Sequence, residues 1–388
     1  MPRMHRTSHY TCSLHVGNFS MYINFWYPIA TSDEVTNDEP HRTQVLGVRL
    51  VAYRDDAGNP HVLADTCVHR GGSLGKGWVR DNCVVCPYHG WRFDKDGMCV
   101  DIPSLTDDEK PPARAKVDSY PVQEQYGIVF AFLGDLPEED RPPLRQIPEW
   151  DQDGWRANKL VVFEVNFFYE RSMENGLDPS HNEFVHPAQG SPVLGDELKR
   201  KPLDVENVPW GSEFIVRFEN KHMGTEGLQE EETLVPEVMA GSGHIGPNQM
   251  ITWINFSKDN SFTQYFYEAP IDENRTRIFF VNMRSWLLEA KHDERITNVN
   301  LMVAKEDIDI LEELDPVRTP ESPSEEVLVR SDGAVTRYRE CLQEWTDKGW
   351  RVDMKSLRSQ SGDRAFAIPS PARRTSKNWV QKIIPLIS

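Results

Sequence analysis

Cys67-Val68-His69 and Cys86-Pro87-Tyr88-His89 are two Cys-His pairs with sixteen residues between them, and they decide how the first part of this chain folds. Each pair presents one thiolate and one imidazole. Two thiolates on one iron and two imidazoles on the other make a Rieske 2Fe-2S cluster, which is less negative than an all-cysteine cluster and has a higher reduction potential. The spacing therefore predicts that two loops hold such a cluster.

The residues that follow each pair suit loops that curl around a cluster. Arg70-Gly71-Gly72 follows the first pair, and Gly90-Trp91 follows the second. Glycine lets the backbone curl tightly and aim N–H groups at sulphur. The flanks therefore agree with the four proposed ligands.

A zinc site is the alternative. Cys83-Val84-Val85-Cys86 has zinc-finger spacing, and Cys67 with His69 would complete a Cys3His set. This alternative leaves His89 without a role and does not explain the glycines. We therefore favour the cluster and interpret Cys83 and Cys99 as thiols with no assigned role.

A second metal pattern lies further along, in Asn175-Gly176-Leu177-Asp178-Pro179-Ser180-His181-Asn182-Glu183-Phe184-Val185-His186. His181 and His186 follow an amide and a carboxylate, which makes the segment too polar for an ordinary core helix. A ferrous oxygenase needs two imidazoles and one carboxylate on one face of the metal, with the opposite face open for O2. The third ligand must then come from elsewhere in the chain.

A carboxylate that a helix buries is the natural third ligand, because most Asp and Glu side chains point to water. The segment 298–314 has helical periodicity, with Val303, Ile310, Leu311 and Leu314 on one stripe. Asp307 falls on that stripe and is the predicted ligand. Glu306, at the margin of the stripe, is the fallback, whereas Asp309 shares its face with Lys305.

These motifs together resemble the catalytic α subunit of Rieske non-haem iron oxygenases, a family of ring-hydroxylating dioxygenases, monooxygenases and demethylases. The resemblance covers roughly residues 22 to 352. It implies that Cys67 and Cys86 bind the cluster iron remote from the catalytic site, and that His69 and His89 bind the nearer one.

The resemblance also implies roles in the second site. His181, His186 and Asp307 would bind one mononuclear Fe(II), and Asn175 would be a polar residue close to it. Asp178 matches the carboxylate that joins an iron-ligand histidine to a cluster-ligand histidine of a neighbouring subunit, which implies a homotrimer. Asp178 also precedes His181 by three residues, so one helical turn would place it beside that imidazole.

The activity implied is that of an oxygenase with one Rieske 2Fe-2S cluster and one mononuclear Fe(II) per subunit. It would use O2 to hydroxylate, demethylate or dihydroxylate a small, largely apolar, cyclic or aromatic compound. The resemblance also implies that a separate ferredoxin or flavin reductase would supply electrons from NAD(P)H. The alternatives are a Rieske electron-transfer or scaffold protein with an inactive mononuclear site, and a zinc-stabilised binding module.

Composition narrows the partners. Sixty-one acidic and forty-three basic side chains give a net charge of −18, which argues against nucleic acid. The six cysteines do not form a secreted disulfide pattern, and no apolar run is long enough to span a membrane. A cytoplasmic location is expected.

The sequence divides into four segments. Residues 1–21 read as a disordered arm or a misassigned start, 22–136 as the Rieske domain with an N-terminal lead-in, and 137–355 as the mononuclear iron catalytic domain. Residues 356–388 carry six Lys or Arg against one acid and are expected to be a disordered tail.

The expected fold class is α+β, with an all-β Rieske domain followed by a helix-grip (START-like) domain that has an antiparallel sheet and a long C-terminal helix. Strands are predicted at 45–53, 62–64, 83–85 and 126–133, then at 159–166, 212–219, 250–255, 262–269 and 275–284. Helices are predicted near 169–184, 286–314 and 333–348, and 137–148 is a proline-rich linker.

Overall fold

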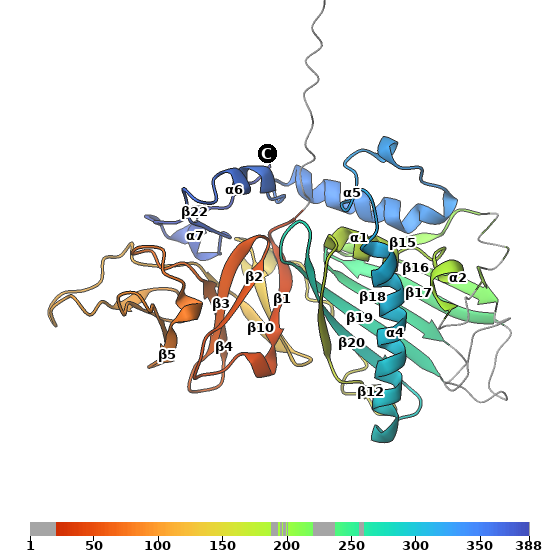
Figure 1. Ribbon diagram of the computed structural model, residues 1–388, viewed down its shortest axis with the longest axis horizontal. Coiled ribbons are helices and arrows are strands. Elements are labelled where there is room, and N and C mark those ends of the chain that lie inside the picture. The colour runs from red at the N-terminus through yellow and green to blue at the C-terminus, as the bar shows by residue number, and fades with distance from the viewer. Residues whose placement is uncertain are drawn as a thin grey trace, which may run out of the picture.

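A computed structural model of the chain describes residues 21–187, 193–194, 196, 199, 201–219, 237–255 and 260–387. The arm or misassigned start predicted for 1–21 lies outside these residues, except for Met21, which is buried. Two bodies lie side by side in Figure 1: a group of small sheets in red to yellow, and a large sheet with helices against it. The α+β fold class and the all-β N-terminal domain are confirmed.

The N-terminal body consists of three small sheets, all antiparallel. The third carries the loop with Cys86 and His89, and the loop with Cys67 and His69 connects the first sheet to the third. In order across each sheet, the strands are β2 (His41–Val45), β3 (Val48–Arg54), β4 (Pro60–Ala64) and β9 (Ser119–Tyr120); β1 (Phe25–Thr31), β11 (Ile128–Leu133) and β10 (Val122–Gln125); and β5 (Trp78–Arg80), β6 (Cys83–Val85), β7 (Arg92–Phe93) and β8 (Cys99–Asp101).

The single strand predicted at 45–53 is wrong, because a hairpin turn interrupts it. β2 ends at Val45 and β3 begins at Val48, so the turn residues are Leu46 and Gly47. Their φ values are 54° and 74°. Two positive φ values match the twist of a tight hairpin, and Leu46 departs from the usual turn composition.

The C-terminal body is built on a nine-stranded antiparallel sheet. Its main path runs β12 (Arg156–Ala157), β20 (Thr276–Arg284), β19 (Ser261–Pro270), β18 (Gln249–Asn255), β17 (Glu237–Ile245), β16 (Gly211–Glu219) and β14 (Val193–Leu194), while β13 (Val161–Val165) pairs with β20 and β15 (Val205–Val208) with β16. Strand β17 was not predicted, because its centre, Ala240-Gly241-Ser242-Gly243, lacks the β-branched and aromatic residues typical of strands.

Helices cover the sheet and cross its end. The long helix α4 (Asp293–Leu311) lies along one face, and α5 (Gly333–Asp347) crosses the upper edge in Figure 1. The shorter α1 (Tyr169–Gly176) and α2 (Asn182–Val185) lie beside α4. Among the described residues no helix is long and apolar enough to cross a bilayer.

Two helix predictions need correction. The helix expected at 169–184 is two helices with a break between Gly176 and Asn182. Pro179 explains the break, because proline lacks an N–H and disfavours helical geometry at Asp178 before it. The helix expected from 286 begins only at Asp293, after a short 3-10 turn over Ala290–His292.

The two bodies share one core. The lead-in strand β1 pairs with β11, while Phe25 packs edge-on against Trp345 of α5 at a ring distance of 4.7 Å. Backbone hydrogen bonds of 2.6–3.0 Å tie Ile23 to Trp350 and Asn24 to Leu133. The predicted linker 137–148 is packed rather than free, because its Leu144 and Ile147 are buried against the sheet.

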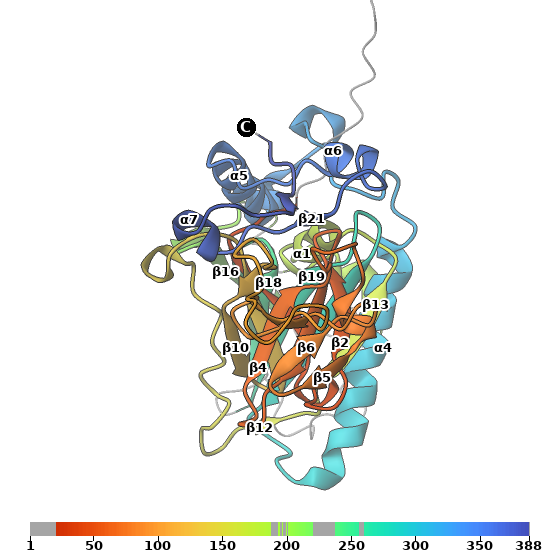
Figure 2. The same ribbon diagram turned by 90° about the vertical axis from the view of Figure 1, so that its left-hand side faces the viewer.

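The disordered tail predicted for 356–388 is wrong. It forms α6 (Met354–Ser359), β21 (Phe366–Ala367), α7 (Ala372–Thr375) and β22 (Lys382–Ile383), and it lies over the N-terminal body in Figures 1 and 2. The basic charge that suggested disorder is used in pairing: Arg373 contacts the fully buried carboxylate of Asp118 at 2.6 and 2.7 Å. A buried carboxylate needs a cationic partner. The N-terminal body supplies the carboxylate of Asp118, and the tail supplies the cation, Arg373.

We predict that Arg373→Ala lowers the free energy of unfolding by about 3 kcal/mol or more, because it leaves the buried Asp118 carboxylate without its cation. Urea denaturation followed by fluorescence measures this change. Arg374→Ala is the matched control, because Arg374 is half exposed and lies 3.4 Å from Asp135. Its loss should cost less than about 1 kcal/mol. Equal effects of the two variants would contradict the account of the tail.

Candidate metal centres

The two loops with the Cys-His pairs use the same backbone device. The Cys67 N–H donates to the Gly72 carbonyl at 2.8 Å, and the Gly71 N–H donates back to the Cys67 carbonyl at 2.9 Å. In the second loop, the Cys86 N–H donates to Trp91 at 2.9 Å and the Gly90 N–H donates to Cys86 at 3.0 Å. Gly71 and Gly90 both have φ of 73°. Each glycine therefore takes the left-handed conformation that closes its loop.

The four predicted cluster ligands come together between these loops. The rings of His69 and His89 lie 4.4 Å apart, and the Cys67 thiol hydrogen-bonds to the Cys86 sulphur. This hydrogen bond lowers the pKa of Cys86 to about 6 and raises that of Cys67. Iron takes thiolates, so a bound cluster would replace the protons of both thiols. A Cβ at Gly72 would meet the Cys86 sulphur at 3.0 Å, so glycine keeps the space between the loops open.

The cysteine side of this site is buried and the histidine side faces outward. Cys67 and Cys86 are almost completely buried, whereas His69 is exposed and His89 half-buried. Trp91 stacks on the His69 ring at 4.6 Å and fixes its plane. Two thiolates within the domain and two imidazoles at its surface fit a Rieske cluster whose histidine edge meets a partner.

The zinc alternative does not gain support. Cys83 is at the start of β6, and burial, followed by the charges of Asp94, Arg92 and Asp81, sets its raised pKa. Within the described part of the chain, one group of three or more His, Cys, Asp or Glu donors lies within 4.8 Å of one another, and it includes neither Cys83 nor the four cluster ligands.

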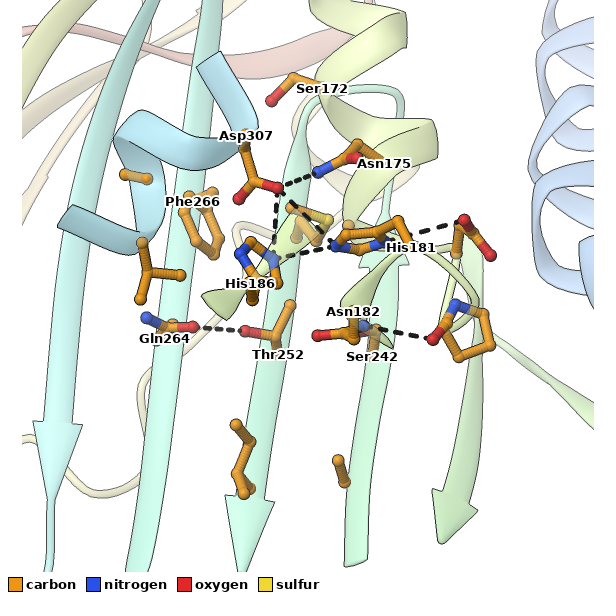
Figure 3. Close-up of a pocket in the computed structure, with 18 of the residues that line it drawn as sticks. Ser172, Asn175, His181, Asn182, His186, Ser242, Thr252, Gln264, Phe266 and Asp307 are labelled. Atoms are coloured by element: carbon orange, nitrogen blue, oxygen red, sulfur yellow. Dashed lines mark hydrogen bonds and ion pairs between the residues drawn. The ribbon is translucent and has the colours of Figure 1, made fainter. Parts of the chain in front are cut away.

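That group is the second site: His181, His186 and Asp307 (Figure 3). The two Nε2 atoms are 3.2 Å apart, and Asp307 Oδ1 lies 3.3 Å from His186 Nε2 and 3.7 Å from His181 Nε2. Donors at right angles about a metal, each about 2.1 Å away, are separated by about 3.0 Å. The triangle therefore fits two imidazoles and one carboxylate on a single face of an iron.

The break between α1 and α2 makes this convergence possible. His181 precedes the first residue of α2 and His186 follows the last, so a single helical turn separates them. Asp307 arrives from α4, which contacts both short helices. Helix α1 is held by buried ion pairs, with Glu174 bound to Arg339 of α5 at 2.6 and 2.9 Å.

A carboxylate stands behind each histidine. His186 Nδ1 lies 3.1 Å from Glu306 Oε2, and His181 Nδ1 lies 3.7 Å from Asp178 Oδ2. The first contact is a hydrogen bond, which holds the Nδ1 proton of His186 and leaves its Nε2 free to bind metal. The second is too long for a hydrogen bond, so Asp178 acts on His181 through its charge. Glu306, the fallback ligand, is therefore placed as the partner of a ligand. This role for Glu306 was not predicted from the sequence. The signal available was a second carboxylate directly beside the predicted ligand Asp307.

Asp178 and His181 shift each other's ionisation. Burial disfavours the charged form of Asp178, but His181 and the Ser180 N–H outweigh burial, and the pKa of Asp178 is lowered. Burial also disfavours protonated His181, yet Asp178 and Asp307 outweigh it and raise the pKa of His181. The expected helical turn between them is wrong, because α1 has ended; the turn at Pro179 places them instead.

The surroundings of Asp307 and Asp309 test the predicted faces of α4. Asn175 Nδ2 donates to Asp307 Oδ1 at 3.0 Å, so it orients the carboxylate oxygen that faces the histidines (Figure 3). Asp309 is exposed and pairs with Lys305 at 2.6 Å, as predicted from its helix face. The stripe itself needs correction, because Ile310 is 51% exposed and Ile308 lines the site instead.

A cavity of about 140 Å³ adjoins the triangle. Its wall is formed by one face of the sheet, by α1 and by α4, and most of its lining is apolar. Figure 3 shows polar side chains both at the triangle and below it. The apolar members include Phe163, Phe167, Phe214, Phe266, Ile278 and Leu311, and the polar ones include Asn182, Ser242, Thr252 and Gln264.

We predict that Cys86→Ser abolishes the electron paramagnetic resonance signal of the reduced cluster, because iron loses one of two thiolates. Spectroscopy of dithionite-reduced protein measures it. Cys83→Ser is the control and should keep the full signal, since Cys83 is outside the ligand group. A signal that survives in Cys86→Ser, or disappears in Cys83→Ser, would overturn the ligand assignment.

Comparison with known proteins agrees with both halves of the chain. Residues 25–121 match the Rieske [2Fe-2S] domain, and residues 165–348 match the vanillate O-demethylase oxygenase C-terminal domain. The chain is 33% identical to phenoxybenzoate dioxygenase subunit alpha of Ectopseudomonas oleovorans over 204 residues, which is 48% of each chain. It is 28% identical to 4beta-methylsterol monooxygenase of Methylococcus capsulatus over 266 residues, which is 66% of this chain and 67% of that protein.

A solved structure shares the fold. NdmB of Pseudomonas putida CBB5 superposes with a TM-score of 0.69 at 25% identity, over 84% of this chain and 91% of that one. The match to the dioxygenase subunit spans only about half of that relative's length. A Rieske [2Fe-2S] domain followed by an oxygenase C-terminal domain, with relatives of the same kind, shows that the chain belongs to the Rieske oxygenases and resembles their α subunits.

Proposed function

We propose that this chain is the oxygenase component of a Rieske system, which uses O2 and relayed electrons to hydroxylate, demethylate or dihydroxylate a small cyclic or aromatic compound. One observation carries the proposal: the triangle of His181, His186 and Asp307 opens onto a largely apolar cavity in a chain that also holds two Cys-His loops. A metal with three protein ligands on one face keeps the opposite face for O2.

The proposed ligand sets follow from the donors. Cys67, His69, Cys86 and His89 would hold the 2Fe-2S cluster, and His181, His186 and Asp307 would hold one Fe(II). When bound, these groups supply electron transfer and the reductive activation of O2. The remaining steps belong to side chains that orient, exclude water or hold protons.

Three side chains would set the shape of the iron site. Glu306 accepts a hydrogen bond from the Nδ1–H of His186, so the Nε2 lone pair of His186 faces the metal position. Asn175 fixes the rotamer of Asp307 through its 3.0 Å hydrogen bond. Asp178 Oδ2, 3.7 Å from His181 Nδ1, would support that imidazole through its charge.

The cavity sets the size of the substrate. Its volume of about 140 Å³ is close to the roughly 150 Å³ of an engineered apolar cavity that binds benzene. Aromatic and branched side chains line most of it, which favours an apolar ring and excludes bulk water. A single substituted ring is therefore the proposed substrate.

Electrons would come from a separate ferredoxin or flavin reductase that oxidises NAD(P)H. The exposed histidine edge of the cluster loops offers a place for transfer, and Tyr88 beside it is 59% exposed. The one G-x-G-x-x-G run, Gly241-Ser242-Gly243-His244-Ile245-Gly246, lies on strand β17 and is followed by strand β18. A dinucleotide fingerprint opens a helix instead, so this run gives no sign of a nicotinamide or flavin site. We also propose a cytoplasmic location, because the proposed reductase uses NAD(P)H and the chain has an acidic composition.

A homotrimer would bring each cluster to the iron of a neighbouring subunit. The cluster loops and α2 lie toward opposite ends of the molecule in Figure 1. Exposed aromatic side chains flank both sites: Tyr88 at the cluster, and Phe184, 81% exposed, between the two iron-site histidines. Asp178 lies next to this surface with its carboxylate partly exposed, as a bridging residue requires.

An electron carrier with an inactive second site is the alternative. Such a protein would not need three donors within 3.7 Å of one another, or carboxylates behind both histidines. These features favour the oxygenase.

Metal content and turnover test the proposal. Wild-type protein should hold three irons per chain, whereas a carrier would hold two. Asp307→Ala should lower the content toward two and abolish substrate-dependent O2 uptake with a surrogate reductase, because one of three ligands is lost. Asp309→Ala, on the solvent face of the same helix, should change neither. Two irons in the wild type, or equal loss in both variants, would refute the proposal.

The bridging role of Asp178 has its own test. Asp178→Asn keeps the shape of the side chain but removes the charge that supports the imidazole. Cluster, iron and trimer should all remain, while oxidation of the prereduced cluster by substrate and O2 should slow by at least about tenfold. Stopped-flow absorbance in a single turnover measures that rate. A wild-type rate would reduce Asp178 to a local partner of His181.

A further inference from the structure

A row of polar side chains crosses the otherwise apolar floor of the cavity. Ser242 of β17 lies opposite Thr252 of β18, Thr252 lies opposite Gln264 of β19, and Gln264 lies opposite Asn282 of β20. Residues directly opposite in an antiparallel sheet project from the same face. The three members Ser242, Thr252 and Gln264 line the cavity, and we call them the polar row.

Apolar side chains border the polar row on both sides. Two residues along the strands toward α1, Met250 is opposite Phe266. Two residues the other way, Ile254 is opposite Phe262. Further along the same rows, His244 of β17 is opposite Met250 and Arg284 of β20 is opposite Phe262, but neither lines the cavity. A polar group that faces an apolar cavity without a hydrogen bond costs stability, so the polar row favours a ligand that it can hydrogen-bond.

The hydrogen bonds within the row leave donors for a ligand. The Thr252 hydroxyl donates to Gln264 Oε1 at 2.9 Å (Figure 3). This leaves the two N–H groups of the Gln264 amide and the Ser242 hydroxyl without a hydrogen bond to any other described residue. Asn282 differs, because Asn300 of α4 and two backbone carbonyls satisfy its amide. The polar row therefore has hydrogen-bond donors available in the cavity, whereas the next residue across the sheet, Asn282, is satisfied beneath α4.

The donors of the row are neutral. No Lys or Arg is among the described residues that line the cavity, and the two acids there, Asp178 and Asp307, are negative. A carboxylate on a substrate would lose its hydration without gaining a cation at the row, which is costly. A carbonyl, amide or hydroxyl oxygen would gain hydrogen bonds without that cost.

The spacing suits one ring. Met250 marks the level of α1, since a Cβ at Gly176 would touch its sulphur. The polar row lies two residues further along β18, which is about 7 Å at the usual strand rise. A single ring thus spans the distance from the level of α1, which carries Asn175, to the row.

We propose that the polar row selects an uncharged ring that carries a hydrogen-bond-accepting oxygen, and discriminates against ring carboxylates. The inference rests on the proposed oxygenase function and names the substrate class of that site. Ser242, Thr252 and Gln264 are specificity residues in this scheme: they hold the polar end of the ring so that the opposite end faces His181, His186 and Asp307.

A matched pair of ligands tests the charge preference. We would titrate the iron-loaded protein anaerobically with 4-methoxybenzamide and 4-methoxybenzoate, which have nearly the same shape, in a calorimeter. The amide should bind at least about tenfold more tightly, because the row cannot neutralise a carboxylate. Equal or tighter binding of the benzoate, or no binding of the amide, would overturn the proposal.

Variants test the residues. Thr252→Val and Gln264→Leu keep the shape of the wall but remove hydrogen bonds, so each should weaken amide binding by about three- to tenfold. Thr252→Ser should restore most of the affinity lost in Thr252→Val. Thr263→Val is the control, because Thr263 is next to Gln264 but bonds to Glu149 on the opposite face. Unchanged binding in the first two variants, or an equal loss in the control, would contradict the assignment.

Calorimetry tests the substrate preference of the polar row, whereas iron content and O2 uptake test the proposed oxygenase function. A protein with three irons that prefers the benzoate would refute the substrate class alone.

Discussion

The second site depends on bringing three donor atoms from two parts of the chain within 3.7 Å of one another. His181 and His186 bracket the single turn of α2, and Asp307 meets them from α4. Such a cluster is unfavourable unless each donor is oriented from behind. Glu306 and Asn175 provide this orientation through hydrogen bonds, and Asp178 supports His181 through its charge. A buried ion pair between α1 and α5 holds the helix that carries Asn175.

At the cluster end of the molecule, both Cys-His loops are closed by the same backbone arrangement. Each loop closes on its cysteine through two backbone hydrogen bonds and one left-handed glycine. The cysteines are thereby buried while the histidines remain outside. The C-terminal segment completes this end, because Arg373 neutralises Asp118 and the Gln381 amide donates to the carbonyl of Thr66, next to Cys67. The tail is therefore part of the support of the cluster loops.

Between the ends, the sheet gives the cavity its chemistry. Every second residue of each strand projects from the face that lines the cavity, and the cross-strand register aligns Ser242, Thr252 and Gln264 on that face. The iron-site ligands lie at one end of the cavity, and neutral hydrogen-bond donors lie below them in Figure 3. Reactivity and selectivity are thus assigned to different elements, the helices and the sheet.

The sequence determined whatever depends on local spacing. The Cys-His pairs, the two histidines, most strands of the large sheet and the solvent face of Asp309 all follow from residues a few positions apart. Tertiary structure decided whatever depends on partners distant in the chain. The pairing of Arg373 with Asp118 turned a basic, proline-containing segment into an ordered one, and Glu306 became the partner of His186 across 120 residues. The polar row exists only through strand register, because no local pattern tells which residues of different strands stand opposite one another.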